Sequence, residues 1–211
     1  MRPILVTGFE PFGGETVNPS AEVARALDGR TIDGVLVHGL VLPCVFGASI
    51  EALRSALNRQ RPQLVLALGL AAGREGFTPE RVAINLDDAR IADNALAQPI
   101  DEPVVAHGPA AYFTTLPIKA MVAALRAAGQ PASVSHSAGT FVCNHLFYGL
   151  QHMTKRRRGT RSGFMHLCAL SGQAGEAPSL PLTTLVQGVA ITLATALATR
   201  DDLHHAEGAL A

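Results

Sequence analysis

The chain has 211 residues, of which 48% are hydrophobic and 16% charged, enough apolar material for one large core. Its 17 basic and 17 acidic residues balance to a formal net charge of zero, which argues against nucleic acid as a partner because no overall positive field attracts phosphates. No stretch approaches the roughly 20 apolar residues that cross a bilayer, and the first apolar run is too short for a signal peptide. We therefore expect one domain over residues 1–211, cytoplasmic and without a membrane contact.

Short apolar runs typical of buried strands lie at 4–7, 34–42, 64–68, 82–85, 132–135 and 163–167. Longer periodic segments predict helices at 21–27, 47–61, 118–128, 141–157 and 182–199. The first helix has a clear start, because Asn18 can cap it and Pro19 suits its first position. The alternation predicts an α/β fold with a central, mostly parallel (mixed) sheet covered by helices on both faces. It leaves open the strand order and whether an edge strand is antiparallel.

Two segments without periodicity interrupt this pattern. Residues 87–113 are rich in Asp, Pro and Gly, which predicts a long excursion with room for one hairpin. Residues 171–181 are loop-like in the same way, and the tail 201–211 is free to fray. The basic run 155–158 falls at the end of a predicted helix, where cations complement the helix dipole, so we interpret it as a solvated cap.

Three cysteines, Cys44, Cys143 and Cys168, have neither close pairing nor C-x-x-C spacing. This argues against a disulfide framework and against a thiolate zinc site, and it predicts reduced thiols. The H-E-x-x-H pattern is absent, and no histidine pair has the companions that a metal site needs. We therefore expect no metal, and one of the thiols is a candidate nucleophile.

Cys143 is the best placed of these thiols. It follows a predicted strand and a turn of small residues, where a helix begins at Phe141 or Val142. The unpaired N–H groups and the dipole at a helix N-terminus favour an anion, so this thiol is predicted to ionise readily and its product oxyanion to find backbone donors. From the local residues alone, a small buried cysteine is the more common interpretation.

Eight histidines compete for the role of general base. His166 ends a predicted strand and would reach the same sheet edge as Cys143 if the two strands run parallel. His145 is only two residues from Cys143 on one predicted helix, so it points away. A carboxylate must orient the imidazole, and Glu80 is one candidate, although its local sequence favours a solvated acid or a pair with Arg81.

The glycine-rich segment 7–14, TGFEPFGG, lies between a predicted strand and a predicted helix, where phosphate-binding loops occur. It contains neither G-x-G-x-x-G nor a Lys-Ser/Thr pair after the glycines, which argues against nucleotide binding. Phe9 and Phe12 would suit the wall of an apolar ligand pocket. Further along, Arg90 is either a surface residue or a group that polarises a substrate carbonyl.

Four stretches form an ordered set along nearly the whole chain. They are VTGFEPFGGETVNPS at 6–20, GLAAGREGFTPERVAINLDDARIADN at 69–94, SHSAGTFVCNHLFYGL at 135–150 and GFMHLCAL at 163–170. Each is weak alone, but the set resembles the pyroglutamyl-peptidase I (pyrrolidone-carboxylate peptidase) family. The resemblance implies an α/β/α sandwich and a cysteine peptidase that hydrolyses the amide bond after an N-terminal pyroglutamyl residue through a thioester acyl-enzyme. It also implies no metal or organic cofactor, and a homotetramer acting on pyroglutamyl peptides.

The resemblance assigns roles to individual residues. The family's catalytic Glu, Cys and His fall, in that chain order, on Glu80, Cys143 and His166. The pocket for the lactam ring falls on Phe9, Phe12, Phe141 and Val142. Arg90 would lie near the site, and Asn18 would support the first loop. An apolar pocket suits a pyroglutamyl group, which is a neutral lactam, whereas an ordinary amino terminus would need a nearby carboxylate.

The chain departs from the family pattern at two places. Leu70 stands where many members have Gln, which removes a polar side chain near the pocket, and Leu167-Cys168 replaces the Val-Pro that often follows the His. We expect Cys168 to be buried. Two alternatives stay open: another cysteine hydrolase or amidase with a shifted substrate, and a small-molecule binding protein that has lost catalysis. The second is disfavoured because all three presumed catalytic residues are present.

Overall fold

The computed structural model describes residues 1–173, 175 and 177–209. Its elements are β1 (Ile4–Phe9), α1 (Pro19–Leu27), β2 (Thr31–Ile32), β3 (Val35–Leu42), α2 (Ala48–Gln60), β4 (Leu64–Leu70), β5 (Phe77–Pro79), β6 (Val82–Ile84), β7 (Ala111–Phe113), α3 (Ile118–Ala127), α4 (Val142–Thr154), β8 (Arg161–Leu167), β9 (Ala169–Leu170), β10 (Ser179–Leu180) and α5 (Leu182–Ala198). All of the predicted helices are present, with ends within a few residues of those expected.

The main sheet has six strands in the order β2-β3-β1-β4-β8-β5. The inner strands β3, β1, β4 and β8 run parallel, while β2 and β5 pair antiparallel at the two edges. Nearly every residue of β4 is buried, as expected for a parallel strand that is covered on both faces. The prediction of a mostly parallel, mixed central sheet is therefore confirmed.

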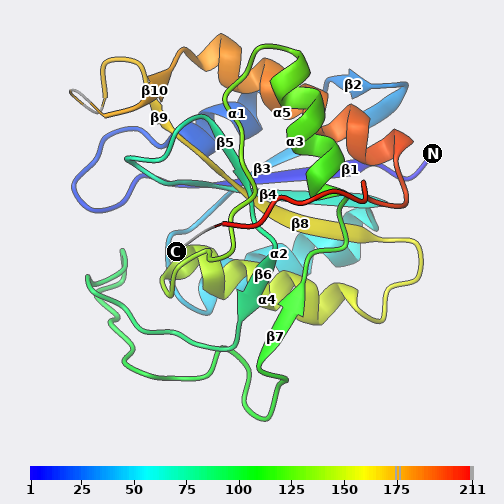
Figure 1. The fold of residues 1–211 in the computed structure, drawn as a ribbon. Coiled ribbons are helices and arrows are strands. Elements are labelled where there is room, and N and C mark those ends of the chain that lie inside the picture. The colour runs from blue at the N-terminus through cyan, green and yellow to red at the C-terminus, as the bar shows by residue number, and fades with distance from the viewer. Residues whose placement is uncertain (174, 176, 210–211) are drawn as a thin grey trace.

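Alternating side chains of the inner strands pack on opposite helical layers. In β1, Ile4 and Val6 belong to a cluster that includes α1, α3 and α5, whereas Leu5 belongs to one that includes α2 and α4. Each of these three side chains is fully buried, which contributes about 1.5–3 kcal/mol relative to exposure. Figure 1 shows the two groups of helices above and below the strands, so the α/β/α sandwich is confirmed.

The sheet is irregular beyond β8, which is the side that carries part of the site. The sequence did not predict β5, which has only three residues and includes Pro79. The predicted strand 132–135 is instead an extended segment that makes isolated bridges to Phe77 and Glu80. Its partner β5 is too short to support a continuous ladder.

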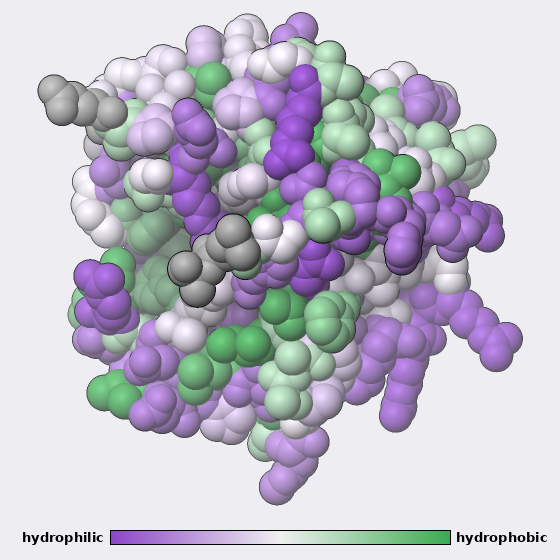
Figure 2. All heavy atoms as spheres, in the orientation of Figure 1, coloured by the Kyte–Doolittle hydropathy of each residue, from purple (hydrophilic) through white to green (hydrophobic). Residues whose placement is uncertain are grey.

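The excursion predicted over 87–113 is present and lies to one side of the sandwich (Figure 1). Its last residues form β7, which pairs antiparallel with β6. Its exposed large apolar side chains are Ile91, Leu96, Ile100 and Phe113. Figure 2 shows apolar surface among polar atoms over the lower part of the molecule, where Figure 1 draws the excursion. Across the described residues, no helix combines the length and apolar character needed to cross a membrane.

Candidate active site

Cys143 lies in the first turn of α4, at the helix start that the sequence predicted. The helix begins at Val142, and Phe141 is its extended N-cap residue. The thiol lies directly over β4, because a Cβ added to Gly69 would be only 2.9 Å from Cys143 Sγ. A contact this short does not occur in real proteins, so a glycine at position 69 allows α4 to bring the sulfur onto the sheet.

His166 is the strand neighbour of Gly69. The parallel register of β4 and β8 pairs these two residues. The His166 ring centroid is 5.0 Å from that of Phe164, the ring that a Gly69 Cβ would also meet. Cys143 and His166 therefore lie on the same face of the sheet, over adjacent parallel strands. The ring of His166 is hydrogen-bonded to Glu80 through Nδ1.

Glu80 holds the other side of the His166 ring. It follows β5, and its Oε1 lies 2.7 Å from His166 Nδ1. Glu80 is 0% exposed and His166 is 4% exposed. Burial raises the pKa of Glu80, but hydrogen bonds from His166, Ser135 and Arg74 bring that pKa below its ordinary value. The ionised carboxylate favours the imidazole tautomer that is protonated on Nδ1, which leaves Nε2 to accept a proton.

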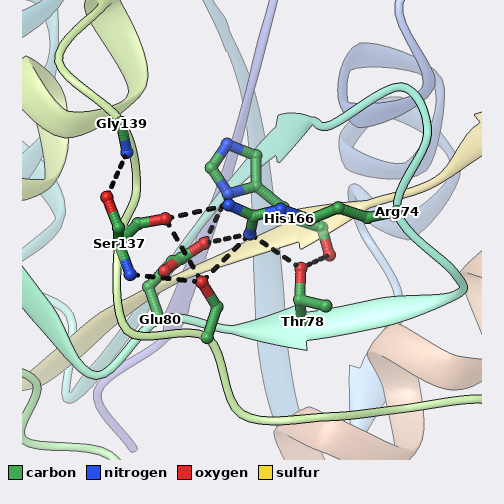
Figure 3. Close-up of polar contacts among 7 residues, drawn as sticks. Arg74, Thr78, Glu80, Ser137, Gly139 and His166 are labelled. Carbon is green, nitrogen blue, oxygen red and sulfur yellow. Dashed lines mark hydrogen bonds and ion pairs between the residues drawn. The ribbon is translucent and has the colours of Figure 1, made fainter. Parts of the chain in front are cut away.

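Arg74 is a member of this cluster that the sequence did not reveal. Its Nη1 donates to Oε1 of Glu80 at 2.7 Å. Figure 3 shows the guanidinium reaching Glu80 and Thr78 beside the His166 ring. The local sequence favoured a solvated Glu80 or a pair with Arg81, and both interpretations are wrong. Only the short separation of Arg74 from Glu80 hinted at the pair, because the direction of a side chain in a turn depends on the fold around it.

Contrary to the prediction that Cys143 ionises readily, the pKa of this partly exposed thiol is raised above its ordinary value. Burial raises the pKa of its thiol, the charges of Cys44 and Glu80 raise it further, and Arg74 lowers it. The N-terminus of α4 favours a thiolate, but burial has the larger effect here. The resting thiol is therefore protonated, and its activation depends on proton transfer to a base.

Three partly exposed aromatic rings gather beside the start of α4. Phe12 and Phe46 both pack against Phe141, with ring centroids 5.9 and 5.4 Å apart. Phe12 and Phe141 were predicted pocket residues, and the structure brings them together. Phe46 was not predicted. It follows β3 at the sheet edge where β4 and β8 also end, and this position was the available signal.

The other two predicted pocket residues are buried. Phe9 is 2% exposed and packs against Phe164, with ring centroids 6.5 Å apart. Val142 is fully buried in α4. Both therefore support the site from the core side, and a direct contact of either with a ligand ring stays a prediction.

Asn18 holds the loop that carries Phe12. Its Oδ1 accepts from the backbone N–H of Ser20 at 3.1 Å, which caps α1 as predicted. Its Nδ2 donates to the carbonyl oxygen of Glu10 at 3.1 Å. One buried side chain thus fixes both ends of the loop.

Arg90 lies on the exposed surface of the excursion. Two residues earlier, the N–H of Asp88 donates to the carbonyl of Thr140 at 3.0 Å, and Oγ1 of Thr140 donates back to the carbonyl of Asp88 at 2.7 Å. Because Thr140 precedes Cys143 by only three residues, Arg90 is carried on a segment anchored near the thiol. Its contact with a substrate carbonyl stays a prediction.

A second buried histidine–carboxylate pair lies on α4. His145 Nδ1 is 2.7 Å from Asp87 Oδ2, and its Nε2 accepts from the N–H of Gly47 at 2.8 Å. Its ring also meets the ring of Phe46 edge-on at 5.2 Å. His145 thus joins the excursion to the turn after β3 and points away from Cys143, as the sequence predicted.

The remaining thiols are structural. Cys44 is 2% exposed and Cys168 is 0% exposed, so the expected burial of Cys168 is confirmed. Burial raises the pKa of Cys44 to about 12, and it raises the pKa of Cys168 as well. Leu70 is partly exposed at the end of β4. In the part of the chain that the structure describes, no group of three or more His, Cys, Asp or Glu side chains is arranged to hold a metal ion.

A cysteine at a helix start, over a sheet edge and beside a buried histidine–carboxylate pair, is the arrangement of cysteine hydrolases. The sequence profile of the family described as pyroglutamyl peptidase matches residues 2–199. The chain belongs to this family.

Individual relatives agree with the family match. The pyrrolidone-carboxylate peptidase of Cupriavidus taiwanensis is 57% identical over 215 residues, covering 100% of both chains. That of Vibrio vulnificus is 51% identical over 212 residues, again covering 100% of both. The crystal structure of pyroglutamyl peptidase I from Bacillus amyloliquefaciens superposes with a TM-score of 0.93 at 45% identity, covering 96% of this chain and 100% of that one.

Proposed function

We propose that this chain is a cysteine peptidase that removes an N-terminal pyroglutamyl residue from peptides and proteins. Its family and the names of its relatives support this reaction. The observation that carries the proposal is the arrangement of three side chains: a thiol over Gly69, His166 on the adjacent strand, and the buried Glu80 bonded to His166.

In the first half of the proposed reaction, Nε2 of His166 takes the proton from Sγ of Cys143 as the sulfur attacks the pyroglutamyl carbonyl carbon. Glu80 stabilises the imidazolium that forms. N–H groups in the first turn of α4, which lack partners within the helix, stabilise the oxyanion. The C–N bond then breaks, and the imidazolium gives its proton to the departing amine.

Water completes the cycle. His166 takes a proton from a water molecule as its oxygen attacks the thioester carbonyl, the C–S bond breaks, and the sulfur regains the proton from the imidazolium. One water is consumed, and the products are pyroglutamate and a peptide with a free amino terminus. The resting site is restored with a protonated Cys143.

The rings of Phe12, Phe46 and Phe141 are the best candidates to recognise the lactam. A pyroglutamyl ring is flat, neutral and without an ammonium group, so aromatic walls suit it. Leu70 adds apolar surface at the end of β4, at a position where many members of the family carry Gln.

We further propose that residues 1–211 act as one catalytic domain, in the cytoplasm, as a homotetramer. Core clusters on the two faces of one sheet support a single domain. Three free cysteines suit a reducing compartment. The apolar side chains exposed on the excursion are candidates for subunit contacts. Light scattering after size exclusion tests the assembly, and a monomer at micromolar concentration would contradict it.

Matched chromogenic amides of pyroglutamate, proline and glutamate test the specificity. We expect turnover of the pyroglutamyl amide and much slower turnover of the other two. A preference for the prolyl or glutamyl amide would support the alternative hydrolase, and binding of pyroglutamate without turnover would support a binding protein.

The nucleophile is tested by substitution and by labelling. Cys143→Ser should abolish cleavage while circular dichroism and Tm stay unchanged, and full activity would refute the assignment. Iodoacetamide should label Cys143 before Cys44 and Cys168, which are almost inaccessible, with protection by pyroglutamate. Equal labelling rates would count against Cys143.

A further inference from the structure

Arg74 places a positive charge on the oxygen of Glu80 that also receives the histidine. Its Nη1 lies 2.7 Å from Glu80 Oε1, and His166 Nδ1 lies 2.7 Å from the same atom. Within the described residues, the other oxygen of Glu80 is buried and has no hydrogen-bond partner. A fully buried carboxylate is costly unless it is paired, so the guanidinium offsets much of the desolvation of this group.

The same guanidinium also holds the turn that leads to the nucleophile. Its Nη2 donates to the carbonyl of Ser137 at 2.9 Å, and its Nη1 also contacts Ser135 Oγ at 3.1 Å. Within this turn, Oγ of Ser137 accepts from the N–H of Gly139 at 3.2 Å. Figure 3 shows Arg74 reaching across from the turn between β4 and β5 to Ser137 and Glu80. One side chain therefore connects the carboxylate to the segment that precedes α4.

A third contact reaches β5, the strand that pairs with the one bearing the histidine. Nη1 of Arg74 lies 3.3 Å from Oγ1 of Thr78. Thr78 pairs with His166 across β5 and β8, and its hydroxyl donates to the carbonyl of His166 at 3.4 Å. Arg74 thus bonds Glu80 itself, and it also bonds Thr78, which supports His166, and Ser137, in the turn before Cys143.

We propose that Arg74 is a positioning residue that keeps Glu80 as an oriented carboxylate and fixes the turn before Cys143. This rests on the proposed function, because the roles of Glu80 and Cys143 are assigned there. The planar fork of arginine is needed, since one arm binds the carboxylate and the other binds a backbone carbonyl. A lysine would supply the charge but only one point of attachment.

Charges around Glu80 give the proposal a pH signature. The groups that face its carboxylate are His166 from β8, Ser135 from the extended segment beside β5, and Arg74, while the thiol of Cys143 lies close enough for their charges to interact. Arg74 lowers the pKa of both Glu80 and Cys143. Its removal takes a positive charge away from the hydrogen-bonded Glu80–His166 pair, which favours proton uptake by that pair, so the acid limb of kcat/KM moves to higher pH.

Two variants and a matched control test this inference. Arg74→Gln should lower kcat on the order of 10- to 100-fold through misplacement of the reacting groups, with a smaller change in KM, and shift the acid limb upward. Arg74→Lys should recover part of the lost kcat and should return the acid limb of kcat/KM most of the way to its wild-type position. The control is Arg126→Gln. It removes a different guanidinium–carboxylate pair, in which Arg126 Nη1 lies 2.6 Å from Glu207 Oε1, and it should keep the wild-type pH profile of kcat/KM.

Substrate-independent labelling separates this inference from the proposed function. The rate of Cys143 alkylation by iodoacetamide should fall in Arg74→Gln and recover in Arg74→Lys, whichever amide the enzyme cleaves. Unchanged alkylation and an unchanged pH profile in a folded Arg74→Gln protein would overturn the positioning role. So would a loss of rate with an unmoved acid limb and no recovery by lysine, because that pattern indicates a merely structural contact. If the wild-type protein does not cleave a pyroglutamyl amide, the proposed function is overturned, but the comparison of alkylation rates stays valid.

Discussion

Gly69→Ala is the most direct perturbation of the contact between α4 and the sheet. The added Cβ would lie 2.9 Å from Cys143 Sγ and 2.8 Å from Cζ of Phe164. Ordinary carbon contacts are about 3.5–4.0 Å, so at least one neighbour must move by several tenths of an ångström. Phe164 is 1% exposed and held in the core, so we expect much of the displacement to fall on the thiol. Overpacking of this kind costs about 1–3 kcal/mol of unfolding free energy.

A loss of activity should accompany the loss of stability. A displacement near 1 Å at a reacting group costs on the order of 100-fold in rate, so a shift of several tenths of an ångström should lower kcat/KM of folded Gly69→Ala on the order of 10-fold. Stopped hydrolysis assays on pyroglutamyl amide, with urea titration of the same samples, measure both quantities. Gly149→Ala is the control, because its Cβ would lie 2.4 Å from Ile50 Cδ1, away from the site. It should lose stability but keep its rate, and a Gly69→Ala protein with wild-type rate would refute the placement of the sulfur.

Three further outcomes are expected. Asn18→Ala removes the cap of α1 and should cost about 1 kcal/mol, or roughly 2–4 °C in Tm by calorimetry; an unchanged Tm contradicts this. Phe46→Leu removes an edge-to-face contact of about 0.5–1.5 kcal/mol and should raise KM roughly 2- to 10-fold, whereas a change confined to kcat would argue against a pocket wall. Glu80→Gln should lower kcat on the order of 10³- to 10⁴-fold. Because the folded pKa of Glu80 is lowered from 4.5, its stabilisation is present above that pH and lost as pH falls through the folded value, so urea titrations should show a flatter acid dependence in Glu80→Gln.

Much of the fold could be predicted because its signals are local. Apolar runs of strand length and the cap at Asn18 mark elements that tertiary contacts then reinforce. Cys143 and His166 lie on the same face of the sheet, as expected, but the assumption behind that expectation is wrong. The segment 132–135 before Cys143 bridges parallel to β5, which is antiparallel to the strand of His166. The family resemblance supplied the choice among eight histidines, which the residues alone left open.

The missed features depend on contacts between distant segments. β5 is short and contains Pro79, so no run of apolar residues marks it. Phe46 lies beside the candidate site because two side chains fix its turn. Nε2 of His145 accepts from the N–H of Gly47 at 2.8 Å, and Oδ2 of Asp93 accepts from the N–H of Phe46 at 2.9 Å. Ionisation of Cys143 was misjudged because a helix terminus can be read from sequence, whereas the groups that other segments pack around a partly exposed thiol cannot.

Glu80 and Cys143 show that hydrogen bonding decides how burial affects a charge. Glu80 is buried with a guanidinium and an imidazole on one oxygen, so its pKa is lowered, whereas the part of the chain that the structure describes gives Cys143 no side-chain hydrogen bond and its pKa is raised. In the proposed mechanism, proton transfer from Cys143 to His166 creates a thiolate and an imidazolium beside an existing carboxylate and guanidinium. The charges of the four groups sum to zero before and after this transfer. Without Arg74 both states would carry one net negative charge, and the thiolate would form beside an uncompensated carboxylate, which supports the positioning role proposed for Arg74.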